Sequence, residues 1–199
     1  MIKEALKFLV GELNEFIAIK TGGDTTRVEL NGLVNQEGMI MIGADRIGCT
    51  LVNIEEERIA RSQVTYAPSL NGNTTRINPT VKLNLYILFA ANPKIETSTT
   101  NYEEGLALIS LVVSFFQSKN HFDAENSPAL DSRINKLLIE LYSLPVEQQN
   151  YLWGSIGAKY MPSVLYRVRL IEIQESNALE SNPMITEVRN GGAETIVHK

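Results

Sequence analysis

A chain of 199 residues with a net charge of −5 and a pI near 5.2 is poorly suited to bind nucleic acid, because phosphate binding needs clustered cations. One cysteine excludes an internal disulfide, and two histidines leave little material for a zinc site. No apolar run approaches the roughly 20 residues that span a bilayer, and acidic residues interrupt the N-terminal sequence MIKEALKFLVGELNEF where a signal peptide would be apolar. The composition predicts a soluble cytoplasmic protein without nucleic-acid or membrane partners.

The N-terminal residues 2–20 are predicted to form an amphipathic helix. Its apolar residues recur at alternating steps of four and three and therefore share one face: Ile2, Leu6, Leu9, Leu13 and Phe16. The sequence Thr-Gly-Gly-Asp at 21–24 then ends the helix, with a glycine available for a left-handed cap. The apolar segments 28–33 and 39–42, separated by Asn-Gln-Glu-Gly, predict a β-hairpin.

Residues 47–59 predict a strand that begins in the core and ends in solvent, because its first half is apolar and its second half is charged. Successive strand residues point to opposite faces, so Glu55, Glu56 and Glu57 cannot converge on a metal ion. With Arg58 they are interpreted as a strand end that faces solvent or a partner. Residues 63–79 are rich in Ser, Asn, Gly, Thr and Pro, contain Arg76, and predict a long loop that makes contacts.

The centre of the chain is predicted to be the strand 80–90 and the helix that follows it. Five apolar residues alternate along this strand: Val81, Leu83, Leu85, Ile87 and Phe89. The helix begins near Thr100, and its apolar stripe is predicted to consist of Tyr102, Leu106, Ile109, Val113 and Phe116. Four further apolar residues widen this stripe until little polar surface remains: Leu108, Leu111, Val112 and Phe115. The helix is therefore expected to be buried against its own sheet or against another subunit.

The last third of the core is predicted to hold a strand at 134–141, a helix at 146–156 and a strand at 163–174. Arg167 and Arg169 share one face of that last strand. Such arginines can bind a phosphate, but more often they pair with carboxylates on a neighbouring strand or subunit. The polar tail after residue 174 has two β-prone segments, 184–188 and 195–197. The tail either frays or adds to another sheet, with side chains that fill pockets there: Ile185, Val188 and Ile196.

The fold class predicted from this order is α+β, with a mixed, largely antiparallel sheet flanked by helices. We expect a core domain at 1–174 and a tail at 175–199. No nucleophile elbow, Walker loop, dinucleotide fingerprint or HExxH motif occurs, and Cys49 in its apolar strand is interpreted as a buried, inert thiol. The sequence therefore predicts a protein that is not an enzyme, with no catalytic residues, no cofactor and no metal.

Five segments carry a resemblance to a known family: IKEALKFLVGELN, LVNIEEERIARSQ, NPTVKLNLYILFAAN, YEEGLALISLVVSFFQSKNHF and PVEQQNYLWGSIGAKYMPSVLYRVRLIEI. They resemble the tail-terminator (cap) proteins of phage-tail-like contractile injection systems, of the antifeeding prophage and Photorhabdus virulence cassette type, in a version similar to that of Bacteroidota. The resemblance covers most of the core and contains no catalytic motif.

The resemblance implies a phage tail-terminator-like fold and a structural role. Such a protein would form a hexameric ring that ends the inner tube, contacting itself, the tube protein and the sheath protein. It would be cytoplasmic during assembly and extracellular as part of a released particle. Two alternatives remain at this point: a monomeric assembly chaperone, and a small-ligand-binding domain that uses residues 63–79 as a lid.

Overall fold

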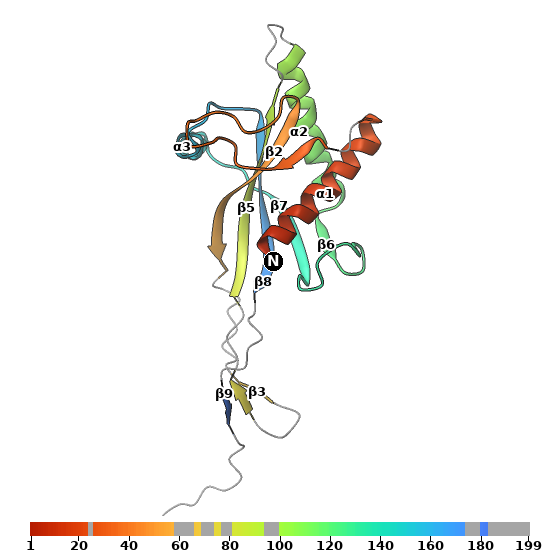
Figure 1. Ribbon diagram of the computed structural model, residues 1–199, viewed down its shortest axis with the longest axis vertical. Coiled ribbons are helices and arrows are strands. Elements are labelled where there is room, and N and C mark those ends of the chain that lie inside the picture. Colours follow the sequence, from red (N-terminus) through yellow and green to blue (C-terminus); the bar gives the residue numbers. More distant parts are fainter. Residues whose placement is uncertain are drawn as a thin grey trace, which may run out of the picture. The chain divides into compact units, whose positions relative to one another are not determined.

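The computed structural model describes residues 1–23, 26–57, 66–68, 74–76, 81–93, 100–173 and 180–182. The chain divides into two compact units. The larger consists of Met1–Ala60 and Val81–Ile173, and the smaller consists of Arg61–Thr80 and Gln174–Lys199. Within the described residues the larger unit contains a six-stranded sheet with helices (Figure 1), and the smaller contains a three-stranded sheet.

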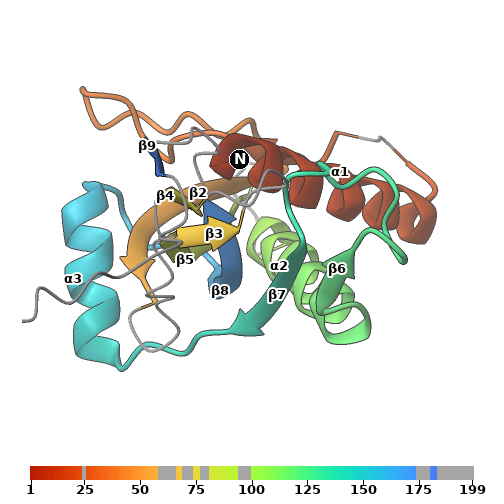
Figure 2. The ribbon, with the colours of Figure 1, turned by 90° about the horizontal axis from the view of Figure 1, so that it is seen from below.

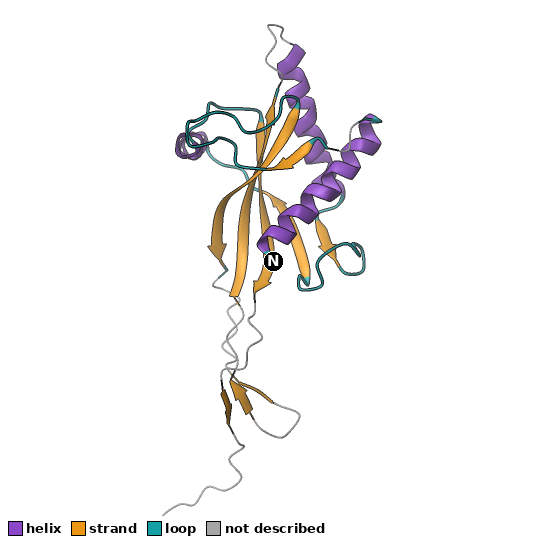
Figure 3. Ribbon diagram, in the orientation of Figure 1, coloured by secondary structure: helices purple, strands orange, loops and turns teal. Residues whose placement is uncertain are grey.

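The six strands of the larger unit, drawn in orange in Figure 3, follow the order β1-β2-β5-β8-β7-β6. Their bounds are β1 Val28–Leu30, β2 Arg46–Glu56, β5 Val81–Asn92, β6 His121–Asp123, β7 Lys136–Leu141 and β8 Ser163–Ile173. The pair β1–β2 is parallel, and the other described pairs of this sheet are antiparallel. The prediction of a mixed, largely antiparallel sheet flanked by helices is confirmed, as are the strands predicted near 47–57, 80–90 and 164–174.

The helices are α1 Ile2–Thr21, α2 Thr100–Ser118 and α3 Val146–Ile156. Helices α1 and α2 cover one face of the sheet, whereas α3 and the chain 31–45 cover part of the other (Figure 2). Gly22 ends α1 with a φ of 62°, and its N–H donates to the carbonyl of Ala18. Only glycine adopts this left-handed conformation at little cost, so the predicted cap is confirmed.

Strand β5 is buried on both sides, which makes it the centre of the sheet. Leu85, Ile87 and Phe89 are fully buried on the α1 and α2 side, and Leu88 and Ala90 are buried beneath α3. The alternation read from the sequence therefore identifies the two faces correctly. The second face is more apolar than that of a one-sided sheet because it too is covered by an element of the chain.

The hairpin predicted from 28–33 and 39–42 is wrong for residues 28–30, which pair as β1 in parallel with β2. The two predicted arms meet only near their turn, through the bridge Val34↔Ile40 and the hydrogen bond from the N–H of Met41 to the Leu33 carbonyl. The side chain of Asn14 on α1 binds the outer edge of β1: its Oδ1 accepts from the N–H groups of Arg27 and Val28, at 2.8 Å each, and its Nδ2 donates to the Val28 carbonyl. This amide occupies the edge that a hairpin partner would need.

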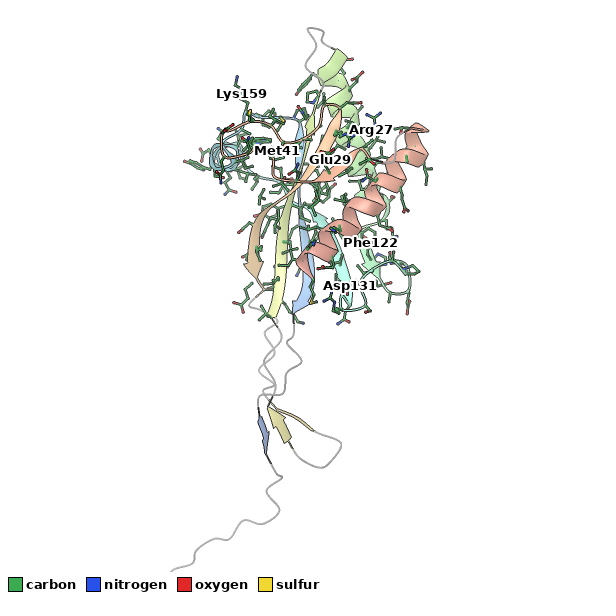
Figure 4. All side chains as sticks on the ribbon, in the orientation of Figure 1. Arg27, Glu29, Met41, Phe122, Asp131 and Lys159 are labelled. Atoms are coloured by element: carbon green, nitrogen blue, oxygen red, sulfur yellow. The ribbon has the colours of Figure 1, made fainter. Side chains whose placement is uncertain are left out.

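Two ion pairs hold β1 and its neighbours in place. Arg27 pairs with Asp45, and Arg46 Nη1 lies 2.6 Å from Glu29 Oε1. Figure 4 labels Arg27, which precedes β1, and Glu29, which lies within β1. Both pairs join residues close to β1 with residues at the start of β2, so they strengthen the parallel contact.

The wide apolar surface predicted for α2 is buried only in part. The buried residues of α2 are Leu108, Val112, Phe115 and Phe116, whereas Tyr102 and Leu106 are exposed. Phe115 and Phe116 both contact aromatic rings of the core. The ring centroids of Phe115 and Phe122 lie 6.2 Å apart, and those of Phe116 and Tyr166 lie 4.8 Å apart. The helix turns to bury this pair, which leaves part of its wide apolar arc outside the core.

The smaller unit corrects the prediction of a loop at 63–79. This segment contains β3 Tyr66–Pro68 and β4 Thr74–Arg76, which pair with each other, and β4 also pairs with β9 Glu180–Asn182. The pairing of β4 with β9 joins segments about a hundred residues apart, and such pairing leaves no signal in a local window of polar residues. The predicted tail strands 184–188 and 195–197 lie outside the described residues.

Replacing Leu85 with alanine should lower the free energy of unfolding by about 2–5 kcal/mol, because it opens a cavity in a fully packed site. Chemical denaturation followed by circular dichroism measures this change. Ile54→Ala, at an exposed position of β2, is the control and should change stability by less than about 0.5 kcal/mol. Equal losses in the two variants would contradict the central position of β5.

Candidate interface on the sheet

The face of the sheet that carries α3 changes from apolar to polar along its strands. Near α3 it presents Leu88 and Leu165, which pack with Trp153. Further along the same strands, polar side chains from β2, β5, β7 and β8 gather into one group. We call this group the polar cluster, and it consists of Glu55, Glu57, Asn84, Tyr86, Glu140, Arg167 and Arg169.

Strand register brings the polar cluster together. Tyr86 of β5 lies beside Arg167 of β8, and Arg167 lies beside Glu140 of β7. Glu55 of β2 is the cross-strand neighbour of Asn84 on β5. Directly opposite side chains in a sheet approach to about 5 Å, which allows these groups to bind one another.

Glu140 is the centre of the cluster because it is shared by two arginines. Arg167 Nη2 donates to Glu140 Oε2 at 2.6 Å, and Arg169 Nη1 donates to Glu140 Oε1 at 3.2 Å. These hydrogen bonds, from Arg167 first, hold the pKa of Glu140 below its ordinary value of 4.5. The prediction that the two arginines pair with carboxylates on a neighbouring strand is confirmed.

The acidic end of β2 is tied to β5. The hydroxyl of Tyr86 donates to Glu55 Oε2 at 2.6 Å, and this hydrogen bond is the main cause that raises the pKa of Tyr86. Asn84 Nδ2 donates to Glu57 Oε2 at 3.2 Å, and Arg169 Nη2 lies 3.8 Å from the same oxygen. Glu55 and Glu57 are therefore fixed in position rather than free in solvent.

The predicted interface residues Glu55 and Glu57 belong to the polar cluster. Glu56 alternates with them and is the cross-strand neighbour of Leu83. Arg76 lies in β4 of the smaller unit. Arg58, Ile185, Val188 and Ile196 lie outside the described residues.

The described residues of this surface offer no group for covalent chemistry. Cys49 is fully buried, and burial raises the pKa of its thiol to about 12, so it carries no thiolate at neutral pH. No group of three His, Cys, Asp or Glu side chains within the described ranges is placed to hold a metal ion. The carboxylates and guanidinium groups of the cluster instead bind each other, as the parts of a structural surface do.

Comparison with known proteins decides the family. Residues 4–187 match the family described as the Pvc16 N-terminal domain. The chain belongs to this family. The match covers nearly the whole sequence and confirms the resemblance to tail terminators of contractile injection systems.

Solved structures show where else the fold of this Pvc16 N-terminal domain occurs. The chain is similar to the sheath/tube terminator of an extracellular contractile injection system, PVC, in its extended state, with a TM-score of 0.53 and 12% identity over 94% of this chain. It also matches the tube-terminating cap of the anti-feeding prophage, with a TM-score of 0.49 and 15% identity over 81% of this chain. The matches span 64% and 56% of those two chains. No curated protein matches the sequence.

Sequence reasoning missed three members of the polar cluster in this Pvc16 N-terminal domain. Asn84 and Tyr86 occupy polar positions of a strand with alternating apolar residues. Glu140 is a charged residue within the otherwise apolar segment that forms β7. A buried or half-buried polar residue in a central strand requires a partner, and this rule is the signal that would have identified them. No helix among the described residues is long and apolar enough to cross a membrane.

The shifted pKa of Glu140 predicts a pH-dependent contribution to stability. Because its folded-state pKa lies below 4.5, the contribution is fully present at neutral pH and is lost as the pH falls through 4.5 and below. Glu140→Gln should therefore be less stable than the natural protein at pH 7, and the difference should shrink towards pH 3. Urea denaturation at several pH values measures it.

The control is Glu15→Gln, at an exposed position of α1. Its difference from the natural protein should be small, because exposed charges contribute little to stability. A stability difference for Glu140→Gln that stays constant from pH 7 to about pH 3 would show that the Glu140 carboxylate makes no favourable ionic contact.

Proposed function

We propose that the protein is a structural cap of a phage-tail-like contractile injection system. Six copies form a ring that ends the inner tube, and the ring contacts the tube protein and the sheath protein. The observation that carries this proposal is the match of residues 4–187 to the Pvc16 N-terminal domain family. The protein assembles in the cytoplasm and leaves the cell only within the released particle, and it acts by binding rather than by catalysis.

The polar cluster supports this proposal as a specificity surface. Its charged groups are already hydrogen-bonded to one another, so a partner meets a fixed pattern of charge. Charged groups at the rim of an interface set the partner and its register more than they set affinity. An acidic strand end at Glu55 and Glu57 then favours a partner that presents basic residues there.

We also propose a division of labour within the chain. The core, residues 1–174, forms the ring, and the tail, residues 175–199, pairs as an added strand with a sheath subunit. Main-chain hydrogen bonds would supply affinity in such pairing, and apolar side chains would supply specificity: Ile185, Val188 and Ile196. Specific subunit contacts of this kind bury on the order of 1,200–2,000 Å².

Cells that make the particle without this protein should release tubes of variable length with detached sheath ends. A tube without a cap has no physical stop to further addition of subunits. Electron microscopy of purified particles measures tube length, and expression of the protein from a plasmid should restore uniform particles. Particles of uniform length with intact sheath ends in its absence would refute the cap and favour an assembly chaperone or a ligand-binding role.

Two truncations separate the tail from the smaller unit. Removal of residues 183–199 leaves β9, whereas removal of residues 175–199 takes away β9 and its pairing with β4. Both variants should keep the melting transition of the larger unit, because its sheet uses neither segment. We expect both to weaken sheath attachment in electron micrographs. Normal particles from both truncated proteins would show that the tail contacts no partner.

A further inference from the structure

The larger unit has an apolar groove between α2 and β7. The groove has a volume of about 500 Å³, and we call it the α2–β7 groove; its lining residues are Val113, Phe116, Gln117, Asn120, Ile139, Glu140, Leu141 and Tyr166. Leu141 is 56% exposed at its edge, and exposed Leu106 and Tyr102 extend the apolar surface along α2. These are the residues that α2 leaves outside the core when it buries Phe115 and Phe116.

One wall of the groove is an open strand edge. Strand β6 pairs with β7 only as far as Leu138. Beyond it, the N–H of Ile139 donates to the Asn120 carbonyl and that of Tyr142 donates to the Leu165 carbonyl. Backbone groups alternate between the two sides of a strand, so those of Leu141 point away from β8. No described strand covers this edge, and an extended segment can pair with it.

A second apolar surface lies on the chain between β1 and β2. Met39, Ile40 and Met41 follow each other, and each is between 44% and 57% exposed. We call them the apolar turn. A run of three exposed apolar residues is rare on a surface that faces only water and marks a contact site. In both views, this part of the chain lies apart from β7 (Figure 1, Figure 2).

The apolar turn is rigid. Asn35 Oδ1 accepts from the N–H groups of Glu37 and Met39, and the N–H of Met41 donates to the Leu33 carbonyl. These bonds fix Met39 and Met41, whereas the N–H and C=O of Ile40 bind none of the described residues.

The apolar turn is anchored on the sheet by the residues that flank it, because the side chains of Leu33 and Ile42 are buried there. There the contact with β2 is so close that a Cβ on Gly48 would lie 2.5 Å from Ile42 Cδ1. Figure 4 shows Met41 on this anchored segment. A preformed segment loses little conformational entropy on binding.

We propose that the apolar turn of one copy docks into the α2–β7 groove of the next copy. Met39 and Met41 enter the apolar part of the groove, and the peptide groups of Ile40 pair with the open edge at Leu141. This inference rests on the proposed ring. A closed ring needs two different, complementary patches on each subunit, and this chain carries both halves: a rigid apolar projection and an apolar groove beside an unpaired strand edge.

Cross-linking between two single-cysteine variants tests the contact directly. Met39→Cys and Leu141→Cys are purified separately, mixed and treated with a short bismaleimide; the natural Cys49 is buried and does not react. We expect a cross-linked dimer in the mixture and none in either variant alone. Ile19→Cys, at an 81% exposed position of α1, replaces Leu141→Cys in the control mixture and should give no dimer.

A charge placed on the turn tests the same contact by affinity. Met41→Glu places the charge on a side chain that enters the groove. It should raise the dissociation constant of the oligomer about tenfold or more in analytical ultracentrifugation, whereas Ile19→Glu should leave it unchanged. Melting curves verify that both variants fold, and the cross-linking result decides if Met41→Glu does not.

An oligomer that forms without the 39–141 cross-link overturns the docking contact and leaves the ring standing. Cross-linking of Met39→Cys with itself also overturns it, because the contact would then be two-fold symmetric. A monomer at every concentration, with no cross-link, overturns both the contact and the ring.

Discussion

Phe89, in the middle of β5, is fully buried and joins parts of the chain that are far apart in sequence. Its ring lies 5.6 Å from that of Phe116 on α2 and 6.0 Å from that of Tyr166 on β8. Aromatic side chains are large, so burying them removes more apolar surface from water than burying other side chains does. The orientation of α2 follows from this contact, and the exposed edge of α2, with the groove beside it, follows from that orientation.

Burial of β5 on both faces also explains the polar cluster. Where α3 no longer covers the sheet, the same strands present side chains that are only half-buried, and charges there need partners. Arg167, Arg169 and Glu140 meet this need on β8 and β7, and Tyr86 and Asn84 do so for the end of β2. The result is a surface of fixed charges, which suits recognition in an assembly better than it suits catalysis.

The two edges of the sheet are treated differently. The amide of Asn14 closes the edge at β1, whereas no described strand covers the outer side of β7, the side away from β8, beyond Leu138. Native proteins commonly block their sheet edges because an open edge pairs with other chains. A protein that must join copies of itself has a use for one open edge, and the proposed cap function gives β7 that use.

Features that depend on local periodicity can be predicted from the sequence alone: the alternating face of β5, the ends of α1, and the spacing that places Arg167 and Arg169 on one side of β8. The sequence also carried the family, since residues 4–187 match the Pvc16 N-terminal domain. Tertiary structure decided the rest. Asn14 of α1 binds the outer edge of β1, the rings of Phe89 and Tyr166 receive Phe116 of α2, and β4 pairs with a segment about a hundred residues later. In each case the two partners come from different elements of the chain, and the local pattern of either one does not identify the other.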